Sequence, residues 1–356
     1  AGLVAYKYKG TMPTNTSIVL KEGSTGIAGS AFWGCSSLTS ITIPESVTSI
    51  GDRAFDSSSL TSIIIPNSVT EMGRGAFCFC HNLETITLGT SISCIKEETF
   101  RNCDKLTTID ISESIKTIEA STFDNCRSLS TVNIHDIAAW CSISGLQNMM
   151  NSGNETKTLL VDGKKVSEID IPAGVLTIPS YAFSSFSNIY SASVPSSVQN
   201  IGDGAFQGCS NLDCVNFASS IPAVFDNSPQ FPNISVLVVP KEAYSDYIAA
   251  WASYKNQIAK ADQYEQSIKV KAQDKFSTLH ESLGEENLLS IGKLTVEGTI
   301  NSYDIMVIRN KMINLKHLDL SKARILACDY EYYTGYHSED DVIGDFAFAY
   351  LNIRSI

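Results

Sequence analysis

The chain has 356 residues, and its hydrophobic fraction of 43% is enough for a substantial core in more than one ordinary domain. Its 38 Asp and Glu residues outnumber 26 Lys and Arg, which gives a net charge of -12 without a basic stripe. Nucleic acid and anionic membrane are therefore not expected partners. No stretch approaches the ~20 apolar residues that span a bilayer. The opening AGLVAYKYKG has neither an initiator Met nor a signal-peptide core, so we expect a mature chain without its targeting segment.

Phenylalanines recur along the chain at an almost constant spacing. The steps are 23, 22, 23 and 23 residues from Phe32 to Phe123, and again 23 from Phe183 to Phe206. The unit around each reads approximately A-F-x-x-C-x-x-L-x-x-I-x-I-P-x-S-V-x-x-I-G, as in AFWGCSSLTSITIPESVTSIG. Such a period predicts a solenoid whose repeat phenylalanines all belong to the core. They are Phe32, Phe55, Phe77, Phe100, Phe123, Phe183 and Phe206.

Each unit contains an alternating apolar pair, such as Ile41 and Ile43, which is typical of a short strand that faces a core. Pro44 ends this strand because proline cannot donate to a β ladder. A second apolar pair, Val47 and Ile50, then returns to the core. We therefore expect an α/β-type repeat solenoid with one short parallel strand per coil. No coil could stand alone, since its faces are covered only by its neighbours.

Cysteines occupy the position three residues after the phenylalanine in five units. Stacked coils would place equivalent Cα atoms roughly 5 Å apart, a separation that a disulfide tolerates. The same position holds Phe186 in another unit, and the Phe55 unit has only serines there, so a thiol is not required. We interpret the column as buried free thiols that act as small hydrophobic groups. Its members are Cys35, Cys80, Cys103, Cys126 and Cys209.

Motifs for catalysis or cofactor binding are missing from the sequence. It has no CxxC pair, HExxH, GxSxG elbow, Walker loop or GxGxxG fingerprint. We therefore expect no enzyme activity, no metal site and no cofactor.

The Cys, Leu, Ile-x-Ile-Pro and Ser-Val positions resemble the BspA-like leucine-rich repeats of bacterial surface proteins. The resemblance covers residues 11 to 258 and implies a leucine-rich-repeat fold. Because BspA-like proteins are associated with adhesion, it also implies a cell-surface or secreted protein whose partner is a host or bacterial surface protein.

The repeat is interrupted once, between Ile134 and Ile171, where 37 residues replace the expected 23. This insertion, near residues 135–168, contains DIAAWCSI, a predicted short helix, and LLVDGKKV, a predicted hairpin that turns at Asp162-Gly163. An enlarged loop on a regular scaffold often carries function, so Trp140 is a candidate binding residue. The alternative is that Trp140 only packs over the edge of the solenoid.

The repeat becomes irregular after Phe217. Aromatic residues on one helical face then predict a capping helix at 241–258. This helix would close the end of a first domain, residues 1–258. The alternative for this aromatic stripe is a binding groove.

Residues 259–268, rich in Lys, Ala, Gln, Asp and Glu, predict a linker. The spacing of Leu315, Leu318 and Leu320 then predicts a second leucine-rich-repeat domain, residues 269–356. The final IGDFAFAYLNIRSI matches IGDRAFDSSSLTSI position for position, so this domain would stop in mid-strand and the full-length protein would continue past Ile356.

The outward strand positions, such as Thr85 and Thr87, form a ladder of small hydroxyl groups without the Trp, Tyr and Arg that favour protein binding. We predict a non-catalytic protein-binding or adhesion module; the alternative is a structural spacer that presents another domain without a ligand of its own. Binding requires a cluster of exposed aromatic or arginine residues, expected near Trp140 or in the 328–341 loop, where the repeat is broken. Candidate residues in that loop are Tyr330, Tyr332, Tyr333 and Tyr336.

Overall fold

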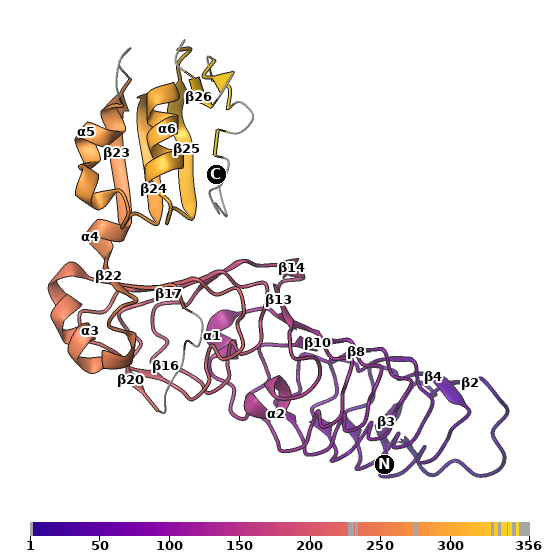
Figure 1. Cartoon of the computed structure of the whole chain (residues 1–356). Helices are drawn as coiled ribbons and strands as arrows, with labels where there is room; N and C mark the ends of the chain where they lie inside the picture. The colour runs from indigo at the N-terminus through magenta and orange to yellow at the C-terminus, as the bar shows by residue number, and fades with distance from the viewer. Residues whose placement is uncertain are drawn as a thin grey trace. The chain divides into compact units, whose positions relative to one another are not determined.

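The computed structural model (Figure 1) describes residues 3–226, 231, 234–272, 277–328, 331–333, 336–339, 341–343 and 347–348, apart from the side chains of Glu286, Tyr333 and His337. The chain divides into two compact units, Ala1–Ser235 and Val236–Ile356. The first is a solenoid of stacked coils. The second combines parallel strands with helices.

One strand from each coil of the first unit pairs in parallel with the strand of at least one adjacent coil. In β10 (Thr108–Ile111), Ile109 and Ile111 are buried and alternate with half-buried polar residues. The coils pair in register, so that Thr108 lies beside Thr131 of the next coil. The others are β2 (Thr16–Val19), β4 (Leu38–Thr42), β6 (Ser62–Ile64), β8 (Thr85–Thr87), β12 (Thr131–Ile134), β15 (Glu168–Asp170), β17 (Ser191–Val194) and β19 (Cys214–Phe217).

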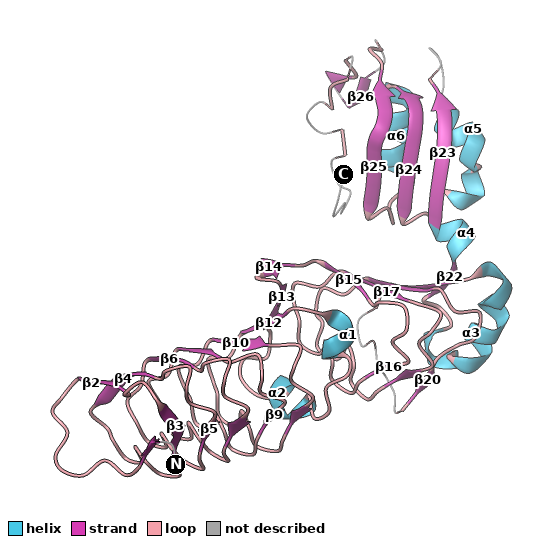
Figure 2. Ribbon diagram, turned by 180° about the vertical axis from the view of Figure 1, so that it is seen from behind, coloured by secondary structure: helices cyan, strands magenta, loops and turns pink. Residues whose placement is uncertain are grey.

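Each coil also contains a second, shorter strand that was not predicted, and the last residue of the second apolar pair lies in it. Ile50 and Met72 are buried and pair in register. Most of these strands have only two residues, too few to show an alternating period in the sequence. Figure 2 shows β3, β5 and β9 on the opposite side of the coils from β4, β6 and β10. They are β1 (Leu3–Ala5), β3 (Ser24–Ile27), β5 (Ser49–Ile50), β7 (Glu71–Met72), β9 (Cys94–Ile95), β11 (Thr117–Ile118), β16 (Thr177–Ile178), β18 (Asn200–Ile201) and β20 (Val224–Phe225).

Each coil turns around its phenylalanine through two left-handed residues, one two positions before it and one two positions after. In the Phe55 coil these are Arg53, with φ 53°, and Ser57, with φ 61°. This conformation costs an L-residue roughly 1–2 kcal/mol. Backbone pairing offsets the cost, because Arg53 N donates to Arg74 O and Ser57 N to Cys78 O, both at 2.8 Å, in the next coil. We call the residues from three before to two after each repeat phenylalanine the Phe turn. Its left-handed pairs are Ser30 and Gly34, Arg53 and Ser57, Gly75 and Phe79, Glu98 and Asn102, Ser121 and Asn125, Tyr181 and Ser185, and Gly204 and Gly208.

All seven repeat phenylalanines are buried, and their rings stack from coil to coil. The centroids of Phe55 and Phe77, for example, lie 5.2 Å apart with nearly parallel rings. Such pairs add about 0.5–1.5 kcal/mol to the burial of the rings themselves. One stack runs from Phe32 to Phe123. A second stack begins at Phe183 and continues to Phe231. Phe231 was not predicted, because the repeat pattern is irregular in that part of the sequence.

The insertion between the two stacks contains the expected helix, α1 (Ile137–Trp140), and the expected hairpin, β13 (Thr158–Val161) and β14 (Lys164–Lys165). A further short helix, α2 (Gln147–Met150), was not predicted. Strand β13 adds a parallel strand to the sheet of β6, β8, β10 and β12, and β14 pairs antiparallel with β13. Two lysines thus occupy the last strand of this sheet, where charged side chains discourage further pairing.

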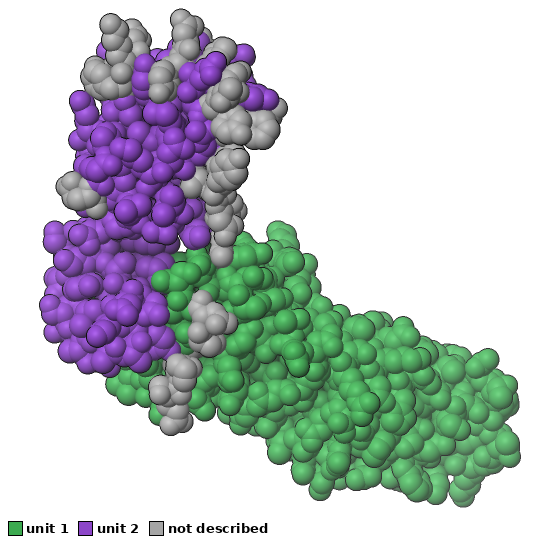
Figure 3. All heavy atoms as spheres, viewed as in Figure 1, with its two compact units in different colours: residues 1–235 green, residues 236–356 purple. Residues whose placement is uncertain are grey.

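The second unit, purple in Figure 3, begins with β21 (Val236–Val239), well before the predicted boundary at residue 258. Strands β21 and β22 (Ile258–Lys260) pair in parallel, and a parallel pair requires a crossover connection. The predicted cap supplies that crossover, which explains why it belongs to this unit. It holds a seven-residue helix, α3 (Tyr244–Ala250), between the 3-10 helices η1 (Lys241–Ala243) and η2 (Ala252–Tyr254). The capping of the first solenoid stays a prediction.

The predicted linker at 259–268 is wrong. These residues form the end of β22, helix α4 (Ala261–Tyr264) and the start of β23 (Glu265–Lys271). In β23 the exposed residues include Glu265, Lys269 and Lys271, whereas Ile268 and Val270 turn towards the core. The charged composition therefore reflects one exposed face of a strand.

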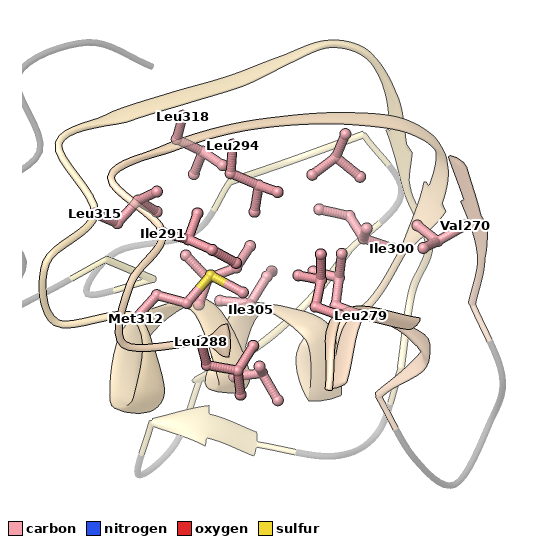
Figure 4. Packing of buried hydrophobic residues seen from close by; sticks show 14 of the residues in the cluster. Val270, Leu279, Leu288, Ile291, Leu294, Ile300, Ile305, Met312, Leu315 and Leu318 are labelled. Carbon is pink, nitrogen blue, oxygen red and sulfur yellow. The ribbon is translucent and has the colours of Figure 1, made fainter. Parts of the chain in front are cut away.

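Strands β23, β24 and β25 form a parallel sheet, and helices α5 and α6 cover one of its faces (Figure 2). The core between them includes Leu294, Ile305 and Leu318 (Figure 4). Leu315 is also buried and Leu320 partly so. The predicted leucine spacing thus marks a strand that follows a helix. The elements are α5 (Thr278–Leu283), η3 (Glu285–Asn287), β24 (Lys293–Ile300), α6 (Ser302–Lys311), β25 (His317–Ile325), β26 (Glu331–Tyr333) and β27 (Tyr336–His337).

The predicted match at the end of the chain can be followed only in part. Phe348 packs, partly buried, against the core of the second unit. Ile353 and Ile356 lie outside the described residues.

Candidate interaction surface

Two of the four tyrosines predicted to bind a partner have described side chains, and neither of these is exposed. Tyr332 is buried in the core of the second unit, which corrects its assignment as a binding residue, and Tyr336 is partly buried against the same core. Tyr330 and the side chain of Tyr333 lie outside the described residues. The neighbouring acidic tract is anchored by the buried Ser338, whose hydroxyl donates to Leu326 O at 2.7 Å.

Trp140, the candidate in the insertion, is only 1% exposed. Its indole Nε1 donates to Ala182 O at 2.8 Å. In a regular coil, the backbone carbonyl of the residue before the repeat phenylalanine accepts a hydrogen bond. The donor is the N–H of the repeat phenylalanine in the preceding coil; Thr122 O, for example, accepts from Phe100 N at 2.9 Å. Trp140 therefore supplies the donor at the start of the second stack. Its packing follows the alternative interpretation, and its assignment as a binding residue is wrong because the ring is buried.

The cysteine column consists of free thiols, as are all ten cysteines of the chain. Four of its members are buried and Cys35 is partly exposed. Each buried thiol donates to the carbonyl of the repeat phenylalanine one coil earlier; Cys126 Sγ, for example, lies 3.0 Å from Phe100 O. Burial raises the pKa of Cys126 and of Cys209 to about 12, so neither is a thiolate at neutral pH. The remaining bonds join Cys80 to Phe55, Cys103 to Phe77 and Cys209 to Phe183.

The outward side chains of the parallel strands form the predicted hydroxyl ladder. Thr85, Thr108 and Thr131 lie in one row across three coils. Ser62 and Thr158 extend the row in either direction. A partner that bound to this row would contact only small polar side chains.

Exposed arginines gather instead on the Phe turns, inside the regular coils. Arg53, Arg74 and Arg101 come from three successive coils, and their side chains are 47%, 50% and 40% exposed. All three converge on the nearly buried carboxylate of Glu98, at N–O distances of 3.4, 3.4 and 2.8 Å respectively.

The left-handed positions explain this convergence. Arg53, Gly75 and Glu98 hold the same place in consecutive coils, two residues before the phenylalanine. Gly75 has no side chain, so Arg53 reaches across that coil; a Cβ at Gly75 would lie 3.4 Å from Cγ of Arg53 and 4.0 Å from Cβ of Glu98. The ion pair joins residues 45 positions apart, beyond any spacing that a local motif would reveal.

The charges of this cluster balance. Burial by itself would raise the pKa of Glu98. The guanidinium groups of Arg101 and Arg74 outweigh this effect and lower the pKa, so Glu98 stays ionised at neutral pH. The buried Asp56 accepts from Arg53 at 3.0 Å, and Glu97 pairs with Arg74 at 3.3 Å. These carboxylates hold the arginine side chains in place, while part of each side chain stays exposed.

Two exposed aromatic rings lie in the same Phe turns. Trp33 is 56% exposed and Phe79 is 39% exposed. Phe79 N donates to Arg101 O at 2.8 Å, and Gly34 N, next to Trp33, donates to Asp56 O at 2.7 Å. The two aromatic residues therefore lie in coils that pair directly with those of Arg53 and Arg101. We call the set Trp33, Arg53, Arg74, Phe79 and Arg101 the arginine–aromatic patch.

Two other features are absent from the described part of the chain. No group of three or more His, Cys, Asp or Glu side chains there is placed to hold a metal ion. Among the same residues, no helix combines the length and the apolar character needed to cross a bilayer.

Parallel strands stacked by a repeat of 23 residues over columns of buried phenylalanine, leucine and isoleucine define the class of leucine-rich-repeat solenoids. The family model of the BspA type leucine rich repeat region matches in 6 copies over residues 5–145 and 160–279. The chain belongs to this BspA-type leucine-rich-repeat family. The unmatched residues 146–159 fall inside the insertion.

Several solved structures of bacterial proteins are similar to the chain. A leucine rich cell surface protein from Faecalibacterium prausnitzii is 25% identical over 57% of this chain, with a TM-score of 0.29, and the chain spans 59% of that protein's length. A leucine-rich repeat protein from Bacteroides ovatus is 19% identical, with a TM-score of 0.37 and coverage of 87% and 74%. The pneumococcal vaccine antigen PcpA is 20% identical, with a TM-score of 0.34 and coverage of 73% and 81%. No curated protein matches the chain at a significant level.

Proposed function

We propose that this chain is a non-catalytic, protein-binding module of a cell-surface or secreted bacterial protein, and that it adheres to a host or bacterial surface protein through the arginine–aromatic patch. Membership of the BspA-type family supports the surface location and the binding role. Unlike the expected sites in the insertion and the C-terminal loop, the patch lies within regular coils.

The observation that carries this proposal is the type of residue that the patch exposes. Trp and Arg dominate binding hot spots, where a few side chains supply most of the affinity. The arginines of the patch are held by carboxylates, so less side-chain freedom is lost when a partner binds. Coils that served only as spacers would need no such cluster.

The test is retention of proteins from a host extracellular-matrix extract by the immobilised full chain. Trp33→Ala and Arg74→Ala should each weaken retention at least about tenfold, since truncating a hot-spot residue costs roughly 2 kcal/mol or more. The matched controls are Tyr6→Ala and Arg127→Ala, which remove an exposed aromatic and an exposed arginine outside the patch. Both controls should retain the partner like the wild type.

The alternative is a structural spacer, favoured by the evenness of the hydroxyl ladder across five adjacent strands. A spacer predicts that no matrix protein is retained at any salt concentration, or that patch and control variants behave alike. Either result would contradict binding through the patch.

A further inference from the structure

A groove of about 660 Å³ lies beyond the carboxyl ends of strands β6, β8 and β10 in the first unit, and eight of its nine lining residues are of polar type. The volume is within the range of small-molecule pockets. None of its lining residues belongs to the arginine–aromatic patch.

Four of the nine lining residues carry a side-chain hydroxyl group. Thr87 and Thr90 come from one coil, and Ser112 and Ser114 from the next. A hydroxyl can donate one hydrogen bond and accept two. The walls are held in place, because Ser114 Oγ donates to Ile92 O at 2.7 Å and Ser112 Oγ lies 2.7 Å from Ser114 Oγ. The groove can therefore exchange hydrogen bonds with a ligand rich in hydroxyl groups.

An imidazole ring in the lining is fixed by two carboxylates. His135 Nε2 lies 2.7 Å from Asp110 Oδ1, and its Nδ1 lies 2.8 Å from Asp162 Oδ1 in the turn of the insertion hairpin. Both ring nitrogens are thus engaged. Asp110 Oδ2 makes no hydrogen bond within the described residues and remains an acceptor for a ligand.

The lining also excludes other kinds of ligand. The carboxylates of Asp110 and Glu113 line the groove against the single imidazole of His135, and no lysine or arginine among the described residues lines it, so the lining disfavours an anion. Leu88 is the one aliphatic residue of the lining and is itself buried, so the apolar surface of the groove comes mainly from the carbon atoms of its polar residues.

We propose that this groove binds a neutral, hydroxyl-rich saccharide. Adjacent sugar hydroxyls would donate to Asp110 Oδ2 and exchange hydrogen bonds with Thr87, while the apolar face of the sugar ring packs against His135. The site is independent of protein binding through the patch. A single groove without a large aromatic platform binds weakly, so several copies on one surface would be needed for firm attachment.

The test applies the full chain to an array of neutral oligosaccharides of glucose, galactose, mannose and N-acetylglucosamine, both as free polysaccharide and as protein-linked glycans. Sialylated and sulfated glycans and cationic peptides share the array. The best neutral ligand is then titrated against the wild type, Thr87→Val and Thr85→Val. These two threonines are exposed on the same strand, but only Thr87 lines the groove.

Valine keeps the β-branched shape of threonine and removes only the hydroxyl. Thr87→Val should weaken binding on the order of tenfold, and Thr85→Val should leave it unchanged within about twofold. Comparing the binding of free polysaccharide with the binding of protein-linked glycans identifies the natural source of the sugar. The proposal is overturned if no neutral saccharide is retained, if acidic glycans or cationic peptides bind better, or if both variants lose binding equally.

Discussion

Gly34 and Ser121 occupy left-handed positions in two different Phe turns, with φ of 70° and 55°. Nothing lies within 4 Å of a Cβ built at Gly34, so Gly34→Ala tests the backbone alone. We expect it to lower the free energy of unfolding by about 1 kcal/mol. Ser121→Gly should raise it by about 0.5–1 kcal/mol, because the relief of strain exceeds the added chain entropy of glycine.

Urea titration of both variants measures these changes, with Ser121→Ala as the control that retains a Cβ in the left-handed region. A stabilisation by Ser121→Ala equal to that by Ser121→Gly would show that the serine hydroxyl, and not the backbone, is unfavourable there.

Phe123 is fully buried, and its ring centroid lies 5.2 Å from that of Phe100. Phe123→Ala should lower the free energy of unfolding by about 3–5 kcal/mol, through lost burial and the cavity that remains. Phe79→Ala removes the same side chain from an exposed position of another coil and should cost less than about 1 kcal/mol. A loss below about 1 kcal/mol at Phe123 would contradict the core position of the repeat phenylalanine.

At the scale of elements, His135 ties the insertion hairpin β13–β14 to the sheet of the solenoid. The hydrogen bond to Asp162, assisted by Asp110, raises the pKa of His135 above its ordinary value. Its folded-state pKa therefore exceeds its unfolded-state pKa of about 6.5. The stability that the ion pairs contribute is fully present below the unfolded-state pKa. It is lost as the pH rises through the folded-state pKa.

The predicted result is that His135→Asn lowers the free energy of unfolding at pH 5.5 and has almost no effect at pH 8.5. The difference should stay below about 1 kcal/mol, since these groups are substantially exposed. Urea titration at both pH values measures it, and Asp162→Asn should remove much of the same pH dependence. An equal cost at the two pH values would mean that packing, and not charge, holds the hairpin.

The elements that the sequence predicted are those whose side chains repeat. Ile109 and Ile111 fix a strand because equivalent apolar pairs recur in every coil, and the hairpin at Asp162 has a strong turn dipeptide. Strand β23 was mistaken for a linker because its exposed face is charged, and only Ile268 and Val270 reveal the buried one.

The candidate site was less predictable than the fold. The left-handed positions hold residues as different as Arg53 and Glu98, so composition does not mark them. The arginine cluster depends on which coils are neighbours in space. Trp140 was singled out for its size, yet its role follows from one buried carbonyl that lies 42 residues away.

At the scale of the whole molecule, the stability of the first unit comes from contacts between neighbouring coils. The N-terminal coil has a neighbour on only one side within the described chain, and Leu3, Val4 and Tyr6 are exposed there. We expect amide hydrogen exchange to be fastest in residues 3–30 and slowest in the coils from Phe77 to Phe123.

Exchange followed by mass spectrometry on proteolytic fragments measures this gradient. Equal protection in all coils would contradict it, and would mean that the first unit opens only as a whole.

The coils of the first unit are joined to one another by hydrogen bonds and packing, and all ten cysteines are free. Nothing covalent except the chain itself therefore resists a pull at one end of the stack. Under such a force the coils would peel away one by one, each releasing about 75–85 Å of extended chain for its 23 residues. The coils that remain would keep their fold. A protein attached at one end and loaded at the other would thus lengthen like a tether that absorbs mechanical work before its attachment breaks.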